Sequence, residues 1–308
     1  MCRALAYLGQ PLALTDLLHR PRNGLVAQSY DPKQLHMLNL AGLGLVAWTN
    51  AADTPLTYRS TTVPVYDKNL ASLAEHVQTD CCLAHIRGIA YRPDASFGPH
   101  NLHPFQHPGT RLALAHNGDL AGFERMKPAL AARLSPERVL AIRGTTDSEW
   151  IYATLLHCLG GRAITVAALG DALRQTVAVL REARAETGID TSSSMNLFFT
   201  DGQVLGVARF TFDFGRYALE PSKVHEANTR YLSLWYGVGE RFAPDARGRW
   251  ALAPAEGRPQ ALLCASEPLS ADPAGWVEVA EYTALLAERG PDGLRLQTLD
   301  LEDDHVAA

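Results

Sequence analysis

Residues 2–8 read Cys-Arg-Ala-Leu-Ala-Tyr-Leu, and this apolar run predicts a buried strand over Ala4–Leu8. Cys2 directly precedes the strand, and it becomes the amino terminus once the initiator Met1 is trimmed, because methionine aminopeptidase acts before small residues. An amino-terminal cysteine carries a strong nucleophile and, in its own α-amine with a pKa of about 7.7–8.0, a proton acceptor. Cys2 is therefore the candidate nucleophile of the chain.

The overall composition is that of a folded globular protein. Of the 308 residues, 47% are hydrophobic and 20% are charged, which excludes a disordered chain and allows one large domain or two. The formal net charge of -5 argues against a nucleic-acid partner or an anionic membrane surface. No apolar run approaches the roughly 18–20 residues of a membrane span, and the apolar run at the start is too short to be expected to act as a signal peptide. We therefore expect a cytoplasmic protein with neither a nucleic-acid nor a membrane partner.

The remaining cysteines and a histidine-rich loop raise the possibility of a metal site. The five cysteines have no zinc-type spacing: Cys2, Cys81, Cys82, Cys158 and Cys264. Cys81 and Cys82 are adjacent in a predicted strand, so their side chains should point to opposite faces of the sheet. His100, His103 and His107 share one loop but lack the carboxylate partners and helical register of a zinc enzyme. We expect no metal and no cofactor.

The hydrophobic pattern predicts short strands interleaved with a few helices. The predicted strands are Ala4–Leu8, Leu43–Thr49, Cys82–Arg87, Leu112–His116, Met195–Thr200, Val204–Phe210, Tyr231–Tyr236, Ala261–Ala265 and Leu294–Leu299. The predicted helices are Asn69–Val77, Phe123–Arg133, Asp147–Cys158 and Val166–Glu186. Asp201-Gly202 between two strands is typical of a hairpin turn. The order of these elements favours an α+β fold with helices packed on layered sheets.

Three further segments carry groups that an α-amino acid substrate would need. Arg87 ends a predicted buried strand, where its guanidinium can hold a carboxylate through two parallel hydrogen bonds. Asn117 and Gly118 follow another buried strand and can offer an amide side chain and a backbone N–H to a developing oxyanion. Asp147 and Ser148 begin a helix, where the carboxylate can hold an ammonium group. Together with Cys2 they indicate a nucleophile, an oxyanion hole and two substrate clamps.

With these residues in place, the chain resembles the class II glutamine amidotransferases of the N-terminal nucleophile hydrolase superfamily. The resemblance is closest to the stand-alone branch, which includes γ-glutamyl hydrolases of the ergothioneine pathway and a subunit of a fungal glutathione-degrading complex. The matching segments follow the family order: Met1-Cys2-Arg3, Gln28-Ser29-Tyr30, Ala84-His85-Ile86-Arg87, Asn101-Leu102-His103-Pro104-Phe105, Ala115-His116-Asn117-Gly118, Thr146-Asp147-Ser148-Glu149 and Ala265-Ser266-Glu267-Pro268-Leu269.

This resemblance implies a four-layer αββα sandwich and an attack by Cys2 on a γ-glutamyl carbonyl that leaves a thioester. It implies that Arg87 binds the α-carboxylate of the substrate and Asp147 its α-amino group. It also implies an oxyanion hole formed by the Asn117 side chain and the Gly118 N–H. Because the family pattern spans most of residues 2–285, we expect one such domain over residues 2–298, followed by an acidic tail over 299–308.

Three further residues lie in family motifs and are assigned to substrate binding: His116, His103 and Ser148. For His103 and Ser148, the residue types themselves indicate only supporting or structural roles. Two positions depart from the family pattern. Ala41 stands where the family has an acidic residue, and Ala90 stands where it often has a hydroxyl. These departures suggest a shifted substrate or an altered use of the thioester.

The sequence leaves four functions open. The leading one is a γ-glutamyl amide or peptide hydrolase that releases glutamate. The second is a glutaminase subunit that passes ammonia to a partner synthetase, and the third is a γ-glutamyl transferase that forms an amide. The fourth is a binding module without catalysis. A small γ-glutamyl substrate is expected in each case, with a homodimer or a partner synthetase or peptidase subunit as possible assemblies.

Overall fold

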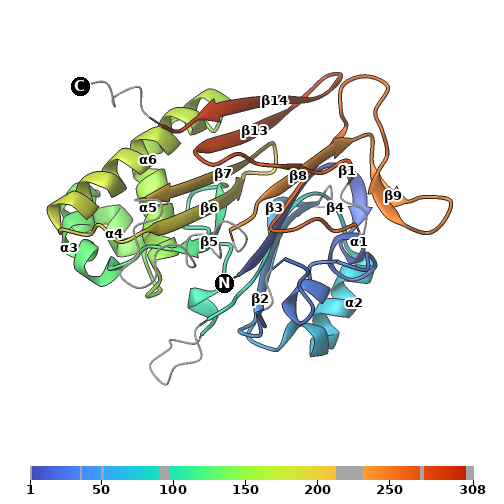
Figure 1. Cartoon of the computed structure of the whole chain (residues 1–308), viewed down its shortest axis with the longest axis horizontal. Helices are drawn as coiled ribbons and strands as arrows, with labels where there is room; N and C mark the ends of the chain where they lie inside the picture. Colours follow the sequence, from blue (N-terminus) through green and yellow to red (C-terminus); the bar gives the residue numbers. More distant parts are fainter. Residues whose placement is uncertain are drawn as a thin grey trace.

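Two antiparallel sheets form the centre of the molecule in the computed structural model (Figure 1). The structure describes residues 2–34, 37–49, 52–89, 98–212, 232–270 and 274–302. Ala90, Tyr231 and residues 303–308 of the expected tail lie outside the described residues.

Within the described ranges, the first sheet has seven strands in the order β12-β8-β11-β1-β4-β2-β3. Their bounds are β1 Arg3–Ala13, β2 Leu43–Thr49, β3 Ala52–Ser60, β4 Gln78–Ile86, β8 Trp235–Gly239, β11 Ala261–Ala265 and β12 Val277–Glu278. The second sheet has five strands in the order β14-β13-β7-β6-β5. Their bounds are β5 Ala113–Asp119, β6 Ser193–Thr200, β7 Val204–Phe212, β13 Thr283–Gly290 and β14 Gly293–Asp300. A separate small hairpin joins β9 Phe242–Pro244 to β10 Trp250–Leu252.

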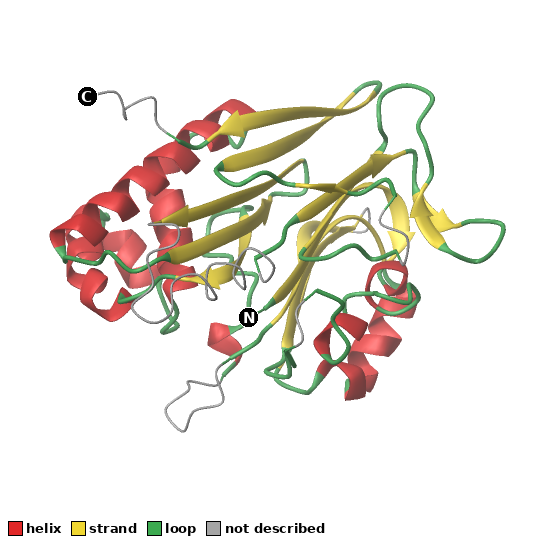
Figure 2. Cartoon of the chain, in the orientation of Figure 1, coloured by secondary structure: helices red, strands yellow, loops and turns green. Residues whose placement is uncertain are grey.

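Helices cover the outer face of each sheet (Figures 1 and 2). The seven-stranded sheet carries α1 Thr15–Leu18 and α2 Lys68–His76, and the five-stranded sheet carries α3 Phe123–Arg133, α4 Pro136–Ala141, α5 Asp147–Leu159 and α6 Val166–Glu186. Short 3-10 turns occur at Ala27–Ser29, Pro64–Tyr66 and Pro99–Asn101. None of the helices in the described ranges is long and apolar enough to cross a membrane.

Three separate apolar clusters fill the three spaces between these four layers. The cluster between the sheets contains Ala4, Ala6 and Leu8, whereas Leu5 and Tyr7 face the cluster beneath α1 and α2. This alternation follows from the two-residue period of a strand. A third cluster joins α3, α5 and α6 to the five-stranded sheet. The expected αββα sandwich is therefore confirmed.

β1 lies at the centre of its sheet and begins at the edge where its two neighbours end. Arg3 pairs with Ile86, near the end of β4, and Leu5 pairs with Ala265, at the end of β11. Cys2 directly precedes this strand. The residues that follow β4 and β11 therefore lie close to Cys2.

Several predicted elements match the structure residue for residue. The predicted and observed bounds coincide for α3, α6, β2 and β11, and β6 and β7 form the expected hairpin at Asp201-Gly202. Cys81 lies in the cluster between the sheets and Cys82 in the cluster beneath the helices. Their predicted opposite orientation is confirmed.

Other elements differ from the prediction. The strand predicted over 231–236 is β8, which begins at Trp235. β3 was not predicted, because it is an edge strand with Pro55 and a half-exposed polar pattern. β13 was not predicted either, although pairing on both sides holds it extended. The tail expected from residue 299 begins inside β14, and Leu301 beyond that strand is buried.

Candidate active site

The Cys2 thiol contacts the backbone of the residue that follows Arg87. The Gly88 N–H donates to Cys2 Sγ at 3.4 Å, and the thiol lies 3.6 Å from the Gly88 carbonyl. Cys2 is only 9% exposed, and this burial raises the pKa of its thiol. The hydrogen bond from Gly88 and the charge on Arg87 oppose that rise. Gly88 and Arg87 therefore both stabilise the thiolate form of Cys2.

A turn before β2 fixes the backbone of Arg87 in two places. The Ala41 N–H donates to the Arg87 carbonyl at 3.1 Å, and the Arg87 N–H donates to the Gly42 carbonyl at 2.9 Å. Gly42 has a φ of 99°, which glycine adopts without strain. A Cβ at Gly44 would meet the His103 carbonyl at 1.9 Å, so a side chain there would displace the neighbouring loop. Ala41 and Gly42 thus hold the backbone of Arg87 in place through these two hydrogen bonds.

The Arg87 guanidinium is half-buried and lies within electrostatic range of two site residues. Burial lowers its pKa, whereas the charges of Cys2 and Asp147 raise it. The three groups predicted to act as nucleophile, carboxylate clamp and ammonium clamp are therefore neighbours. They come from the start of β1, the end of β4 and the start of α5.

Asn117 and Gly118 lie near the end of β5, on the other sheet. The Asn117 side chain is fully buried, and its Nδ2 donates to Ser266 Oγ at 3.3 Å. The same Ser266 hydroxyl accepts a hydrogen bond from the N–H of Ala4, two residues after Cys2. A Cβ at Gly118 would meet the Ser194 carbonyl at 2.1 Å, so this position requires glycine. Asn117 is thereby connected to the strand that carries the thiol.

Asp147, Ser148 and His116 form a continuous polar chain. Asp147 accepts hydrogen bonds from the N–H of Leu120 at 2.8 Å and from the N–H of Ser148 at 2.7 Å. The Ser148 hydroxyl lies 3.1 Å from the Asp147 carboxylate and 2.9 Å from His116 Nδ1. His116 Nε2 donates to the Ser194 carbonyl at 3.2 Å. Since a carboxylate has about four lone-pair sites, Asp147 can accept a further hydrogen bond from a bound ammonium.

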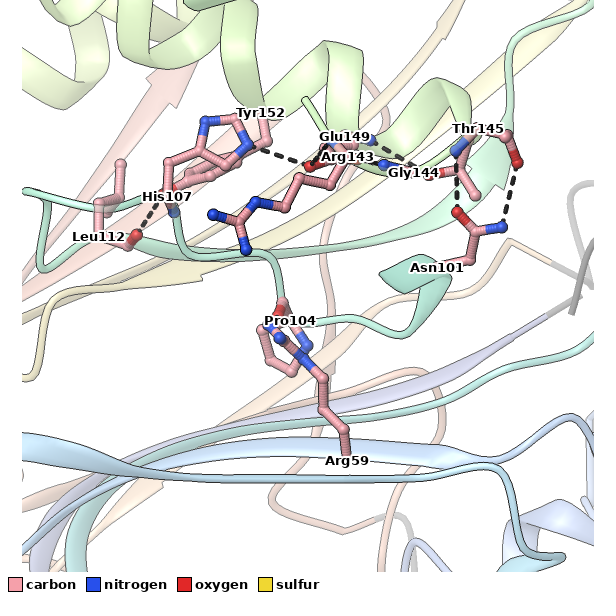
Figure 3. A network of polar contacts seen from close by, with 11 residues as sticks. Arg59, Asn101, Pro104, His107, Leu112, Arg143, Gly144, Thr145, Glu149 and Tyr152 are labelled. Atoms are coloured by element: carbon pink, nitrogen blue, oxygen red, sulfur yellow. Dashed lines mark hydrogen bonds and ion pairs between the residues drawn. The ribbon is translucent and has the colours of Figure 1, made fainter. Parts of the chain in front are cut away.

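Glu149 fixes the turn that precedes the polar chain of Asp147, Ser148 and His116 (Figure 3). Its buried carboxylate accepts hydrogen bonds from the N–H groups of Arg143 at 3.0 Å and Gly144 at 2.6 Å, and it lies 3.2 Å from His107 Nε2. Asn101 and Thr145 form two hydrogen bonds. The Thr145 N–H donates to Oδ1 of Asn101, and Nδ2 of Asn101 donates to the Thr145 hydroxyl. The loop before β5 and the start of α5 are therefore locked together, which fixes where Asp147 lies.

A second buried charge lies beneath Cys2. Arg3 is fully buried, and its Nη1 donates to the Cys2 carbonyl at 3.2 Å. Burial lowers the pKa of Arg3, and the nearby Glu267 carboxylate opposes that shift. Glu267 also accepts hydrogen bonds from the backbone N–H groups of Lys33 and Gln34. Arg3 thus holds the backbone of Cys2 through this hydrogen bond.

His85 and His103 form a buried pair of imidazoles under the site. Nδ1 of His103 lies 2.9 Å from Nε2 of His85, and the rings meet edge to face. Burial, together with the charges of Arg87 and His116, lowers the pKa of His85 to about 3. Burial and the neighbouring His85 lower the pKa of His103 as well. Both rings are therefore neutral at physiological pH.

This pair predicts a loss of stability in mild acid. Below the unfolded pKa of 6.5, the unfolded chain binds protons that the folded His85 and His103 do not. As the pH falls below 6.5, the free energy of unfolding should therefore decrease, with a limiting slope of about 1.4 kcal/mol per pH unit for each histidine. Urea denaturation between pH 7 and pH 5 measures this slope. His103→Phe should remove the contribution of one histidine from the slope, and an unchanged slope would contradict the neutral state of the buried His103.

His76→Gln is the matched control for that experiment. His76 lies on α2 and is exposed in the folded chain, so its replacement changes no buried ring. The contribution of the buried pair to the slope should persist in this variant.

The structure brings the predicted site residues together around the start of β1. Arg87, Asp147, Ser148 and His116 are connected to Cys2 by contacts or charge, and Asn117 is connected through Ser266. His103 contacts His85 beneath them. Their individual roles remain predictions. Of the loop histidines, His103 contacts His85 and His107 contacts Glu149.

Two residues of this site were not predicted as functional. Glu149 directly follows the Asp-Ser pair, and its sequence position indicates only a helix start. In the structure its carboxylate binds the preceding turn. Ser266 lay in a matching motif without an assigned role. Its contact with Asn117 depends on how the two sheets pack, which local sequence patterns do not specify.

Comparison with known proteins identifies the family. Residues 42–212 match the family model described as class II glutamine amidotransferases. A probable glutamine amidotransferase of Saccharomyces cerevisiae, DUG3, is 27% identical over 94% of this chain and 82% of its own length. The γ-glutamyl-hercynylcysteine sulfoxide hydrolase of Mycobacterium tuberculosis is 30% identical over 70% of this chain and 88% of its own.

A solved structure has the same fold. The glutamine aminotransferase class-II domain protein of Silicibacter pomeroyi aligns over 98% of this chain and 100% of its own, with a TM-score of 0.61 and 24% identity. The chain belongs to the class II glutamine amidotransferase family, and it is a hydrolytic enzyme of that family.

Proposed function

We propose that this enzyme hydrolyses γ-glutamyl amides or peptides through a thioester on Cys2 and releases glutamate. The contact of Cys2 Sγ with Gly88, directly after Arg87, carries the proposal most directly. This contact supports the proposal because Arg87, whose charge acts on the thiol, is suited to hold an α-carboxylate. Asp147, whose charge acts on both, supplies the opposite charge for an α-ammonium.

The α-amine of Cys2 can transfer the proton in each chemical step. After removal of Met1, the α-amine of Cys2 takes the thiol proton, and sulfur attacks the γ-carbonyl carbon. The oxyanion accepts hydrogen bonds from Asn117 and the Gly118 N–H. The C–N bond then breaks, and the leaving amine takes the proton from the α-ammonium.

Water completes the cycle by attacking the thioester. The α-amine accepts a proton from this water as the new C–O bond forms. The C–S bond breaks, glutamate leaves, and the proton returns to sulfur. One base therefore serves both halves of the reaction.

The mycobacterial relative supports a leaving group larger than ammonia. The mycobacterial relative is named for the hydrolysis of γ-glutamyl-hercynylcysteine sulfoxide, whose leaving group is an amine larger than ammonia. We therefore propose γ-glutamyl compounds with a substituted amine as the preferred substrates over glutamine.

A substrate panel tests the proposal. Purified protein, with Met1 removal checked by mass spectrometry, is incubated with glutamine, γ-glutamyl 4-nitroanilide and γ-glutamylglycine. Glutamate and the free amine should appear in equal amounts, with a higher kcat/KM for the substituted amides. Absence of glutamate from every substrate would reject the function. Transfer of the glutamyl group to an added amine, without free glutamate, would favour the amide-forming alternative.

Arg87→Ala should raise KM and lower kcat/KM by about 10- to 150-fold, because a charged hydrogen-bonded pair contributes about 1.5–3 kcal/mol. The matched substrate control is 4-aminobutanamide, which is glutamine without its α-carboxylate. The unsubstituted enzyme should lose activity on this compound, and Arg87→Ala should lose little more. If the loss caused by Arg87→Ala and the loss caused by removing the α-carboxylate multiply instead, Arg87 does not bind the carboxylate.

A further inference from the structure

Ser266 sits between the strand of the nucleophile and the second sheet. It follows β11 and is fully buried. Its N–H donates to the Ala4 carbonyl at 3.0 Å, and the Ala4 N–H donates to Ser266 Oγ, also at 3.0 Å. At the end of the pairing between β1 and β11, the Ala4 N–H therefore binds the Ser266 hydroxyl instead of a backbone carbonyl.

The same hydroxyl also fixes the side chain of Asn117. Nδ2 of Asn117 donates to Ser266 Oγ at 3.3 Å, and within the described part of the chain this is the carboxamide's one hydrogen bond. A serine oxygen has two lone pairs, and here the donors are the Ala4 N–H and the Asn117 amide. One N–H of the Asn117 amide is thereby held, and its second N–H is left to bind another acceptor.

We propose that Ser266 is a positioning residue that orients Asn117 as an oxyanion donor next to Cys2. The inference rests on the proposed function, because it assigns Asn117 the oxyanion role given there. A donor lowers the barrier only if it points at the developing oxyanion before the reaction begins. Ser266 meets this requirement by tying the carboxamide to the Ala4 backbone, two residues from the nucleophile.

The test measures kcat and KM on γ-glutamyl 4-nitroanilide for Ser266→Ala, Asn117→Ala and the double variant. Ser266→Ala should lower kcat about tenfold, as expected for loss of the hydrogen bond that orients Asn117, with KM within about twofold. In the double variant, the loss should equal that of Asn117→Ala alone, because Ser266 acts through Asn117. Ser266→Thr, which keeps the hydroxyl, should recover part of kcat.

Ser233→Ala is the matched control. The Ser233 hydroxyl is also buried and donates to the Ser266 carbonyl at 2.8 Å, without a hydrogen bond to Ala4 or Asn117. It should lower the melting temperature about as much as Ser266→Ala and leave kcat unchanged. An equal fall of kcat in both serine variants would mean that Ser266 is only structural.

The outcomes separate this inference from the proposed function. If the unsubstituted enzyme releases no glutamate from the panel, the function fails and the inference falls with it. If the enzyme releases glutamate as proposed and Cys2→Ala abolishes this release, but the losses of Ser266→Ala and Asn117→Ala multiply, only the positioning role is overturned. A kcat unchanged in Ser266→Ala overturns it as well.

Discussion

Cys2→Ala should lower the release of glutamate by at least about a thousandfold, because no other group replaces a lost covalent nucleophile. The variant should fold normally, since the Cys2 side chain makes its hydrogen bonds only with Gly88 among the described residues. Initial rates on the best substrate of the panel measure the effect. Glutamate release that persists at a comparable rate would rule out Cys2 as the nucleophile.

Cys158→Ala is the control for this substitution. Cys158 is a half-buried thiol on α5, and burial raises its pKa. Its loss should leave kcat and KM unchanged. Alkylation by iodoacetamide should inactivate Cys158→Ala as fast as the unsubstituted enzyme.

The same mechanism requires a free α-amine at Cys2. A form of the protein that retains Met1 has an amide nitrogen there, which is not basic at neutral pH. That form should be as inactive as Cys2→Ala, although it keeps the thiol. If it is fully active, a different base must take the thiol proton.

The fold was predictable where one face of an element is continuously apolar. α6 has Leu169, Leu173, Val177 and Leu180 on one buried face, so its helical period is unambiguous. β13 shows the opposite case, because Thr283–Gly290 contains Ala, Leu, Glu and Arg, which favour helices. Pairing with β7 and β14 overrides that local preference. The sequence does not reveal such pairing, because both partners are distant along the chain.

The candidate site was predictable as a set of residues and unpredictable as a connected arrangement. A recognisable helix or strand starts or ends at or near each of four predicted residues, whose types indicate the chemistry: Cys2, Arg87, Asn117 and Asp147. Ser266 acquires its place from the register that pairs Leu5 with Ala265 and so sets Ser266 beside Ala4. A shift of one residue in that register would turn its side chain to the other face.

The second large effect is expected for Asn117→Ala, which should lower kcat by about 10²–10³-fold with little change in KM. The Asn117 amide would bind the oxyanion only in the transition state, so its loss affects the rate more than substrate binding. Asn117→Asp should be at least as slow, because a carboxylate repels the developing negative charge. Steady-state kinetics on γ-glutamyl 4-nitroanilide measure both variants.

Alkylation of Cys2 by iodoacetamide distinguishes this role from damage to the nucleophile. Thiol alkylation displaces iodide at a carbon and forms no oxyanion, so it does not need the Asn117 donor. The alkylation rate of Asn117→Ala should therefore match that of the unsubstituted enzyme while its kcat falls. If both rates fall together, Asn117 acts by holding the start of β1 through Ser266, and the oxyanion must be stabilised by other donors.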